Sequence, residues 1–138
     1  MSWANTELKT LDLGDSRLNK RAITLVEAFS AKPTASIPKA CGGWADTQAA
    51  YRFFANEKVD WQAILAPHIQ NSVVRMAAHD VVLCIQDTTE LDFNGQKATG
   101  LGPLSYESQR GMYVYPTYAV STSRAPGRDQ GWWKGRSP

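Results

Sequence analysis

Three carboxylates that follow one apolar run are the first candidates for chemistry. Asp87 comes directly after the run that ends at Ile85-Gln86, and Glu90 and Asp92 lie a few residues further on. A Mg²⁺ site for phosphodiester chemistry needs several oxygen ligands that converge on octahedral positions. Because side chains alternate faces along a strand, Asp87 is expected to point away from Glu90 and Asp92. The stretch therefore offers one metal ligand, Asp87, and the alternative of a turn or cap residue stays open.

Basic side chains recur at helical spacing near the N-terminus. Arg17, Lys20 and Arg21 stand at i, i+3 and i+4, and Arg52 follows in a later segment. Lysine and arginine on one helix face can contact DNA phosphates. Acidic residues balance the same region, so an ordinary solvated face is the competing interpretation.

Composition sets the broad class of the protein. The chain has 138 residues, of which 43% are hydrophobic and 20% charged, and a formal net charge of +2. These values favour a globular, soluble chain over a disordered one, and no apolar run is long enough to span a bilayer. The first residues show no signal-peptide pattern, so we expect a cytoplasmic protein. The charge alone neither requires nor excludes nucleic acid.

The first half of the chain has the period of helices. Asp15 or Ser16 can cap a helix whose apolar stripe includes Leu18, Leu25 and Phe29 and which ends before Pro33. One helical turn is expected at 37–41. Two further helices are predicted, one capped by Asp46 and one capped by Asp60.

The last of these helices carries a predicted apolar face and a helix breaker. Leu65, Ile69, Val73 and Met76 share one face, and Pro67 predicts a kink or a break. Trp44 and Trp61 are expected to be core or helix-packing residues. Together these elements predict a helical bundle over 13–79, with 1–12 as an N-terminal extension.

The pattern changes to that of strands after His79. The run Val81–Ile85 is β-branched and uniformly apolar, which is typical of a strand buried on both faces, and it continues to Phe93. A glycine-containing loop leads to a second strand over Met112–Val120, where Pro116 indicates an unpaired side. The fold class is therefore α+β, with domains at 13–79 and 80–121, and residues 122–138 show no period.

Five short motifs together resemble one family. They include Leu-Gly-Asp-x-Arg at 13–17 and Gln-Asp-Thr-Thr at 86–89, and their order and spacing matter more than any one of them. The set is similar to the opening part of the DDE transposases of the Insertion Sequence Four type, which include the Tn-five-like transposases. The matching ranges are 13–21, 50–56, 86–89, 101–104 and 110–114.

The resemblance implies a helical DNA-binding domain followed by an RNase H-like catalytic domain. It implies that Asp87 is the first of three metal-binding carboxylates, and that Arg17, Arg21 and Arg52 occupy positions used on DNA; Lys20 is added from helical spacing alone. Intact family members use Mg²⁺, but we expect none to bind tightly here, because the other two carboxylates lie beyond this chain. The likeness stops after Ser121, where the composition is that of a coding region read out of frame, so 122–138 is expected to be a disordered tail.

The expected function is that of a truncated transposase that recognises double-stranded DNA at transposon ends and is catalytically incomplete by itself. Its expected protein partners are a second copy or an intact transposase. Two alternatives remain open: a regulator that competes with intact transposase for the ends, and a helical protein-interaction module without a DNA function. Salt-dependent binding to DNA separates the last from the others.

Overall fold

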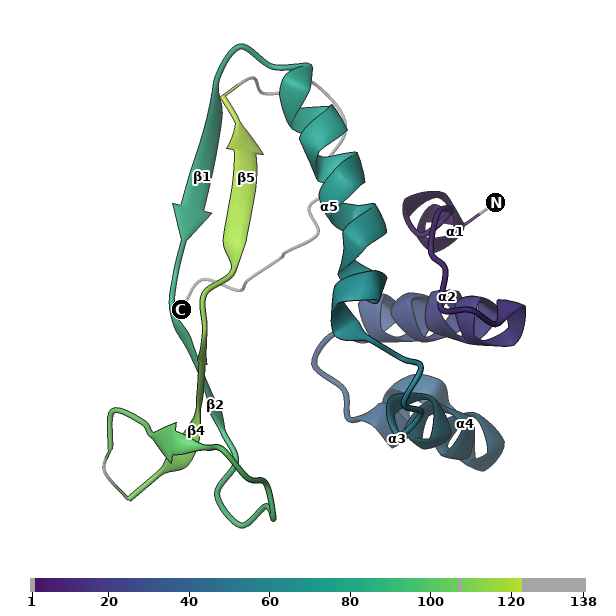
Figure 1. Ribbon diagram of the computed structural model, residues 1–138, viewed down its shortest axis with the longest axis vertical. Helices are drawn as coiled ribbons and strands as arrows, with labels where there is room; N and C mark the ends of the chain where they lie inside the picture. Colours follow the sequence, from purple (N-terminus) through teal and green to yellow (C-terminus); the bar gives the residue numbers. More distant parts are fainter. Residues whose placement is uncertain (1, 107, 123–138) are drawn as a thin grey trace. The chain divides into compact units, whose positions relative to one another are not determined.

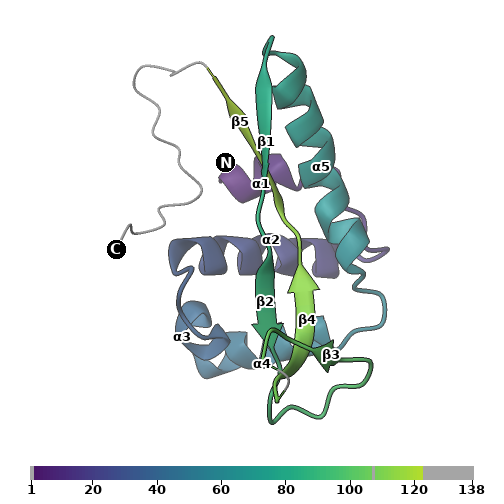
Figure 2. The ribbon, with the colours of Figure 1, turned by 90° about the vertical axis from the view of Figure 1, so that its left-hand side faces the viewer.

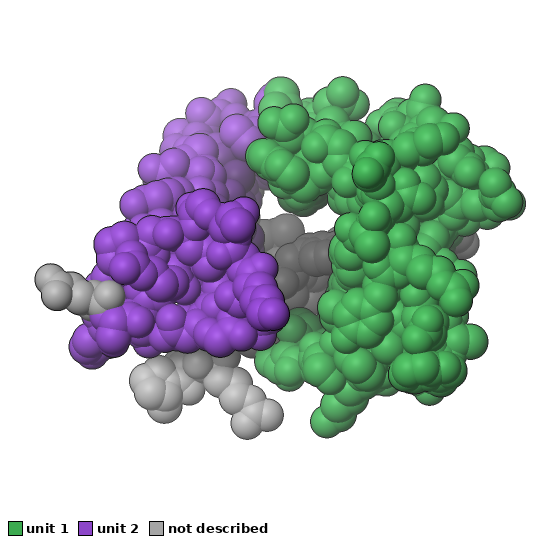
Figure 3. Space-filling view, turned by 60° about the horizontal axis from the view of Figure 1, so that its bottom comes forward, with its two compact units in different colours: residues 1–75 green, residues 76–138 purple. Residues whose placement is uncertain are grey.

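The computed structural model describes residues 2–106 and 108–122, which form two compact units. Unit 1 spans Met1–Arg75 and unit 2 spans Met76–Pro138. Figure 3 shows the two units in separate colours. Unit 1 is helical, and the strands lie in unit 2. This agrees with the mixed helix and sheet content expected from the sequence.

Two capped helices open unit 1 (Figure 1). The short α1 spans Trp3–Glu7, and the Ser2 side chain accepts a hydrogen bond from the Asn5 N–H. The longer α2 spans Ser16–Ala31, and its N-cap Asp15 accepts from the Arg17 N–H. A short side-chain oxygen at this position satisfies a donor that the helix itself leaves unpaired. The predicted start and end of α2 are both confirmed.

A glycine turn joins the next two helices. The single-turn helix α3 spans Ile37–Cys41, as predicted, and ends at Gly42, whose φ of 76° is left-handed. A residue with a Cβ adopts this conformation at a cost, so glycine is favoured there. Helix α4 spans Trp44–Phe54 and has Gly43 as its N-cap. The prediction that Asp46 caps this helix is wrong, since Asp46 lies inside its first turn.

The last helix, α5, spans Trp61–Ala77. It begins as predicted, with the Asp60 carboxylate accepting a hydrogen bond from the Ala63 N–H at 2.9 Å. The helix runs through Pro67 without a break, contrary to one of the two predicted outcomes. The lost backbone hydrogen bond is offset by tertiary packing, because Pro67 is buried and Ala63 and Ile64 pack on the core.

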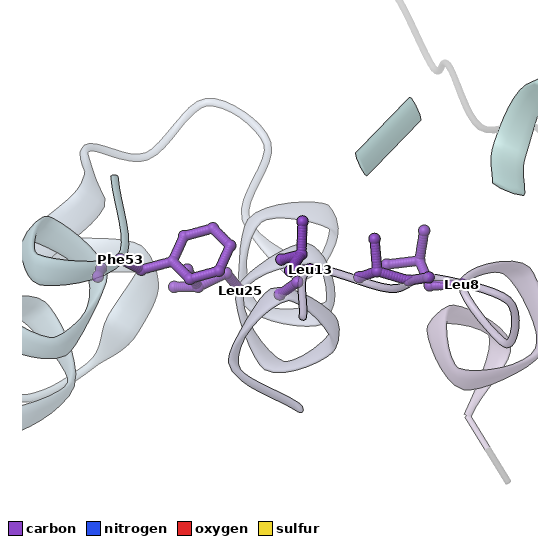
Figure 4. Close-up of a cluster of buried hydrophobic side chains, with 7 residues drawn as sticks. Leu8, Leu13, Leu25 and Phe53 are labelled. Atoms are coloured by element: carbon purple, nitrogen blue, oxygen red, sulfur yellow. The ribbon is translucent and has the colours of Figure 1, made fainter. Parts of the chain in front are cut away.

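The core of unit 1 joins the N-terminal segment to α2 and α4. Figure 4 shows Phe53, Leu25, Leu13 and Leu8 in succession from α4 through α2 to the segment after α1. Phe29 of α2 also stacks on Phe54 of α4, with ring centroids 6.3 Å apart. The full buried cluster is Leu8, Leu11, Leu13, Ala22, Leu25, Ala50 and Phe53. Residues 1–12, expected as an extension, thus contribute Leu8 and Leu11 to this core.

A polar cluster, the Glu7 clasp, fixes α1 to α5. The Glu7 carboxylate accepts two hydrogen bonds from Arg75, both at 2.9 Å. The same carboxylate lies 2.5 Å from Nδ1 of His68, and the Glu7 carbonyl accepts from Asn71. Hydrogen bonds from Arg75, opposed by burial and aided by His68, lower the pKa of Glu7. Four side chains thus hold two elements that are far apart in the sequence.

The apolar face of α5 is therefore not the face that contacts α1. The predicted stripe exists, but Leu65, Ile69 and Val73 are 42%, 56% and 56% exposed. Trp61, expected to be a core or helix-packing residue, is 66% exposed. The polar residues of the Glu7 clasp occupy the side of α5 that faces unit 1. The apolar stripe of α5 therefore lies on a side that unit 1 does not cover.

Unit 2 contains two antiparallel ladders along one hairpin (Figure 2). Strands β1 (Val82–Gln86) and β5 (Thr117–Ser121) form one ladder. Strands β2 (Thr89–Asp92) and β4 (Arg110–Val114) form the second, and β3 (Gly102–Pro103) pairs with the other side of β4. Each predicted long strand is thus divided into two.

The division falls at a proline. Gln86 pairs with Thr117 and Thr89 pairs with Val114, so the register is the same on both sides of the gap. In that register Asp87 lies opposite Pro116, which has no N–H to donate to a ladder. The gap between the two ladders consists of Asp87, Thr88, Tyr115 and Pro116.

The burial predicted for the first strand is not found within unit 2. Leu83 and Ile85 of β1 are each 52% exposed. The first three residues of its partner β5 are also exposed. A two-stranded ladder covers neither of its faces, whatever the composition of its strands. The expectation of a disordered tail over 122–138 lies outside the described residues, apart from Thr122.

Candidate nucleic-acid interface

Helix α2 presents the predicted basic row on consecutive turns. Arg17 and Lys20 are exposed, and Arg21 is partly buried on the side of the helix nearer its core face. Ala22 and Leu25 are buried on the neighbouring core face, and Leu25 follows Arg21 by one helical turn. The structure thus brings these three cations together on α2, because a 3.6-residue period places i, i+3 and i+4 side by side.

Arg17 is held by the residue that caps its own helix. Its Nη2 lies 3.2 Å from Oδ2 of Asp15, while its backbone N–H donates to Oδ1 at 2.8 Å. The side-chain hydrogen bond from Arg17, followed by the backbone one, lowers the pKa of Asp15. The Arg17 side chain is nevertheless 89% exposed, so it stays accessible to an external anion.

Arg21 is held by a different helix. Its Nη1 lies 3.3 Å from Oδ1 of Asp46, in the first turn of α4. The Arg21 side chain is 34% exposed and that of Asp46 is 62% exposed. Among the residues that the structure describes, Lys20 has no such counter-ion.

Helix α4 has an outward face of its own, made by the exposed Trp44 and Arg52 with the half-buried Gln48 between them. These residues recur at i, i+4 and i+8, opposite the buried Thr47, Ala50 and Phe53. Trp44 is 77% exposed, so the expectation of a core or helix-packing residue is wrong. The outward face combines a cation, an amide and an indole, which are all side chains that contact nucleic acids.

Arg52 therefore lies on a separate helix from the row of α2. Arg52 has no ion pair with any described residue. The ion pair between α2 and α4 joins Arg21 to Asp46 and does not involve Arg52. Sequence reasoning selected Arg52 but missed Trp44 and Gln48, although their four-residue spacing was visible. Whether each of the four basic residues contacts DNA stays a prediction.

Asp87 lies at the gap between the two ladders of unit 2. Its side chain is exposed, and Oδ1 accepts a hydrogen bond from the Thr88 N–H at 2.8 Å. Within residues 2–106 and 108–122, no group of three or more histidine, cysteine or acidic side chains is placed to hold a metal ion. Fewer than three such side chains therefore gather at Asp87 among the described residues.

The carboxylates of Glu90 and Asp92 accept hydrogen bonds from the loop before β4. Glu90 accepts hydrogen bonds from the side chain and the backbone N–H of Ser105, and these bonds lower its pKa. Asp92 accepts from Gln109 at 3.1 Å and from the Asn94 N–H at 2.8 Å. Both carboxylates are thus engaged with the loop and not with Asp87.

The comparison with known families concerns the N-terminal unit. None of the helices in the described part of the chain is long and apolar enough to cross a membrane. Residues 1–59, which include α1 to α4, match the family model for transposase DNA-binding. The part of the chain that carries the basic row and the outward face of α4 is thus similar to the DNA-binding region at the N-terminus of transposases.

Proposed function

We propose that unit 1 binds the double-stranded DNA at the ends of a transposon. The observation that carries this proposal is the match of residues 1–59 to transposase DNA-binding, together with the cations of α2 and α4 inside that range. The five sequence motifs support the narrower assignment to the Insertion Sequence Four type. On this proposal the partner is duplex DNA, and protein partners such as a second copy remain secondary.

The arrangement of α3 and α4 supports a role for α4 in reading DNA. A short helix, a glycine turn and a second helix also form the helix–turn–helix motif, whose second helix enters the major groove. Here α3 ends at the left-handed Gly42, and α4 begins directly after Gly43. In this proposal Gln48 and Arg52 face base edges, while Arg17, Lys20 and Arg21 of α2 face phosphates.

The two groups of residues have different expected chemistry. An arginine or glutamine that pairs with a base edge discriminates between sequences, whereas a lysine or arginine on a phosphate binds any sequence. Truncating Arg52 should therefore relax the sequence preference. Truncating Arg17 and Arg21 should weaken binding to all duplexes about equally.

The test is a salt titration of DNA affinity with the full chain. Arg17→Ala with Arg21→Ala should lower the affinity for a terminal-repeat duplex, and removing each cation that binds a phosphate should reduce the slope of log K against log salt by up to about 0.9, less for an arginine that is paired with a carboxylate in the free protein. The control is Lys9→Ala, a loss of one positive charge outside α2 and α4. Equal affinities and slopes for the double variant and the wild type would rule out the α2 row as a phosphate-binding surface.

We further propose that unit 2 is the beginning of an RNase H-like catalytic domain and that these 138 residues alone do not cut DNA. Strand cleavage of this class requires carboxylates that hold two metal ions against the attacking and leaving oxygens. Asp87 supplies one carboxylate, while Glu90 and Asp92 accept hydrogen bonds from the loop before β4. Cleavage of end-containing DNA in Mg²⁺ or Mn²⁺ by the purified chain, abolished by Asp87→Ala, would contradict this.

A further inference from the structure

Both arginines of the α2 row are paired with carboxylates in the free protein. Arg17 lies 3.2 Å from Asp15, and Arg21 lies 3.3 Å from Asp46. A phosphate that binds at the paired N–H groups, which are Nε and Nη2 of Arg17 and Nη1 of Arg21, has to displace a carboxylate. The row that the sequence presents as three cations is thus largely neutralised before DNA arrives.

The two carboxylates differ in what else they do. Asp15 also caps α2, so its position is explained by the helix itself. Asp46 caps nothing, because Gly43 is the N-cap of α4, and within the described residues its carboxylate accepts its hydrogen bond from Arg21. At 62% exposure it is not required by the packing of the core.

We propose that Asp46 is an autoinhibitory counter-ion that withholds Arg21 from phosphates and so limits the affinity of unit 1 for DNA of any sequence. This inference rests on the proposed DNA-binding function. Binding a phosphate through Nη1 of Arg21 requires the Arg21–Asp46 pair to open, and at the other N–H groups the phosphate meets a guanidinium whose charge Asp46 already offsets. After opening, the Asp46 carboxylate lies close to the bound phosphate and repels it.

The size of the effect follows from the exposure of the pair. Surface ion pairs of this kind shift an equilibrium by about 1.5- to 5-fold. A like charge within a Debye length of a phosphate adds a factor of about 2 at moderate salt. Asp46→Asn keeps the shape of the side chain and removes both effects. It should therefore raise the affinity for a duplex of random sequence by about 3- to 10-fold at about 100 mM salt.

The salt dependence provides a second, independent readout. In the wild type, Arg21 exchanges the Asp46 carboxylate for a phosphate. Fewer counter-ions are therefore released on binding than when an unpaired arginine binds the phosphate. With Asp46→Asn, Arg21 enters the complex as an unpaired cation, and the slope of log K against log salt should steepen by up to about 0.9. A change that merely stabilised the fold would leave this slope where it was.

The experiment compares four forms of the full chain on one fluorescently labelled random duplex by anisotropy. They are the wild type, Asp46→Asn, Arg21→Ala and the double variant. Asp60→Asn is the matched control, because it makes the same change in net charge at the N-cap of α5, where asparagine also caps well. Thermal melting of each form verifies the fold, and Asp46→Ala replaces Asp46→Asn if that variant melts early.

The inference expects the gain from Asp46→Asn to fall to about 2-fold or less when Arg21 is absent, since only repulsion then remains. An affinity of Asp46→Asn equal to that of the wild type or Asp60→Asn would overturn it, as would an undiminished gain without Arg21. Failure of the proposed function has a different signature. In that case none of the four forms binds the duplex.

Discussion

Gly111 of β4 occupies a position that leaves no room for a side chain. A Cβ built there would lie 2.0 Å from the Leu91 carbonyl oxygen and 2.8 Å from Cδ1 of Leu104. Leu104 is buried at 6% exposure, and Leu91 belongs to the neighbouring strand. Backbone atoms cannot yield as the end of a flexible side chain can, so any larger residue must push β2 away from β4.

We predict that Gly111→Ala disrupts the β2–β4 ladder. The overpacking should cost at least about 2 kcal/mol, which a small ladder cannot absorb. Amide hydrogen exchange in residues 89–92 and 110–114 should become fast. Gly102→Ala is the control, because a Cβ at Gly102 meets no atom within 4 Å. Unchanged protection in Gly111→Ala would show that the strands are further apart than the structure places them.

At the scale of elements, the Glu7 clasp determines how α5 is oriented. Glu7 is separated by 61 residues from His68 and by 68 residues from Arg75. Both side chains of α5 contact the Glu7 carboxylate at the end of α1. The side of α5 that bears this cluster therefore faces inward. The apolar stripe of α5 faces outward for the same reason.

We predict that Glu7→Gln lowers the free energy of unfolding by about 1 to 2 kcal/mol at neutral pH, because two charge-assisted hydrogen bonds from Arg75 are weakened. The pKa of Glu7 is lower in the folded state, so its contribution is complete above its unfolded pKa of about 4.3. The contribution is lost as the pH falls through the lower folded value.

Urea unfolding of the wild type and Glu7→Gln from neutral to strongly acidic pH measures this difference, and the two curves should converge at the acid end. Glu57→Gln, a matched change in the turn after α4, should have little effect. A difference between the wild type and Glu7→Gln that persists undiminished at the acid end would contradict the assignment, since Glu7 is then protonated.

Local signals in the sequence predicted those features that depend on local physics. Asp15 and Pro33 bounded α2 because capping and proline sterics act within a few residues. The outward direction of Trp44 and Leu65 was not predictable in this way. A period shows that an apolar face exists, whereas the cluster that turns it inward or outward is non-local.

The residues of the candidate site also differ in whether local signals in the sequence could predict them. Arg17 and Arg21 were selected by residue type and helical spacing. The counter-ion of Arg21 lies 25 residues away on another helix, and no local pattern relates the two. Asp87 was found from its motif, but its position opposite Pro116 required the strand register.

At the scale of the whole molecule, the two units differ in how much of their own apolar surface they cover. Unit 1 buries a contiguous cluster from Leu8 to Phe53. In unit 2, Leu104 is the one buried residue of large apolar type among those described, while Leu83, Ile85 and Tyr118 are more than half exposed. Exposed apolar strands with unpaired edges promote association with other chains.

We predict that limited chymotrypsin digestion leaves unit 1 as the resistant fragment and cleaves unit 2 early. Tyr106 and Tyr115 lie outside the ladders and are 72% and 67% exposed, so they are the expected sites. Mass spectrometry identifies the fragments, and light scattering should show that the intact chain associates more than the fragment does. A resistant, monodisperse monomer that extends through Val120 would contradict this.

The gap opposite Pro116 interrupts the ladder pairing in the middle of the long hairpin of unit 2, so we expect the hairpin to bend there more easily than within either ladder. Because the register is the same on both sides of the gap, bending there does not slide one strand along the other. The ladder β1–β5 and the ladder β2–β4 can each keep its own twist while the angle between them changes. Asp87 lies in this gap, so we expect the direction of its carboxylate to depend on the angle between the two ladders.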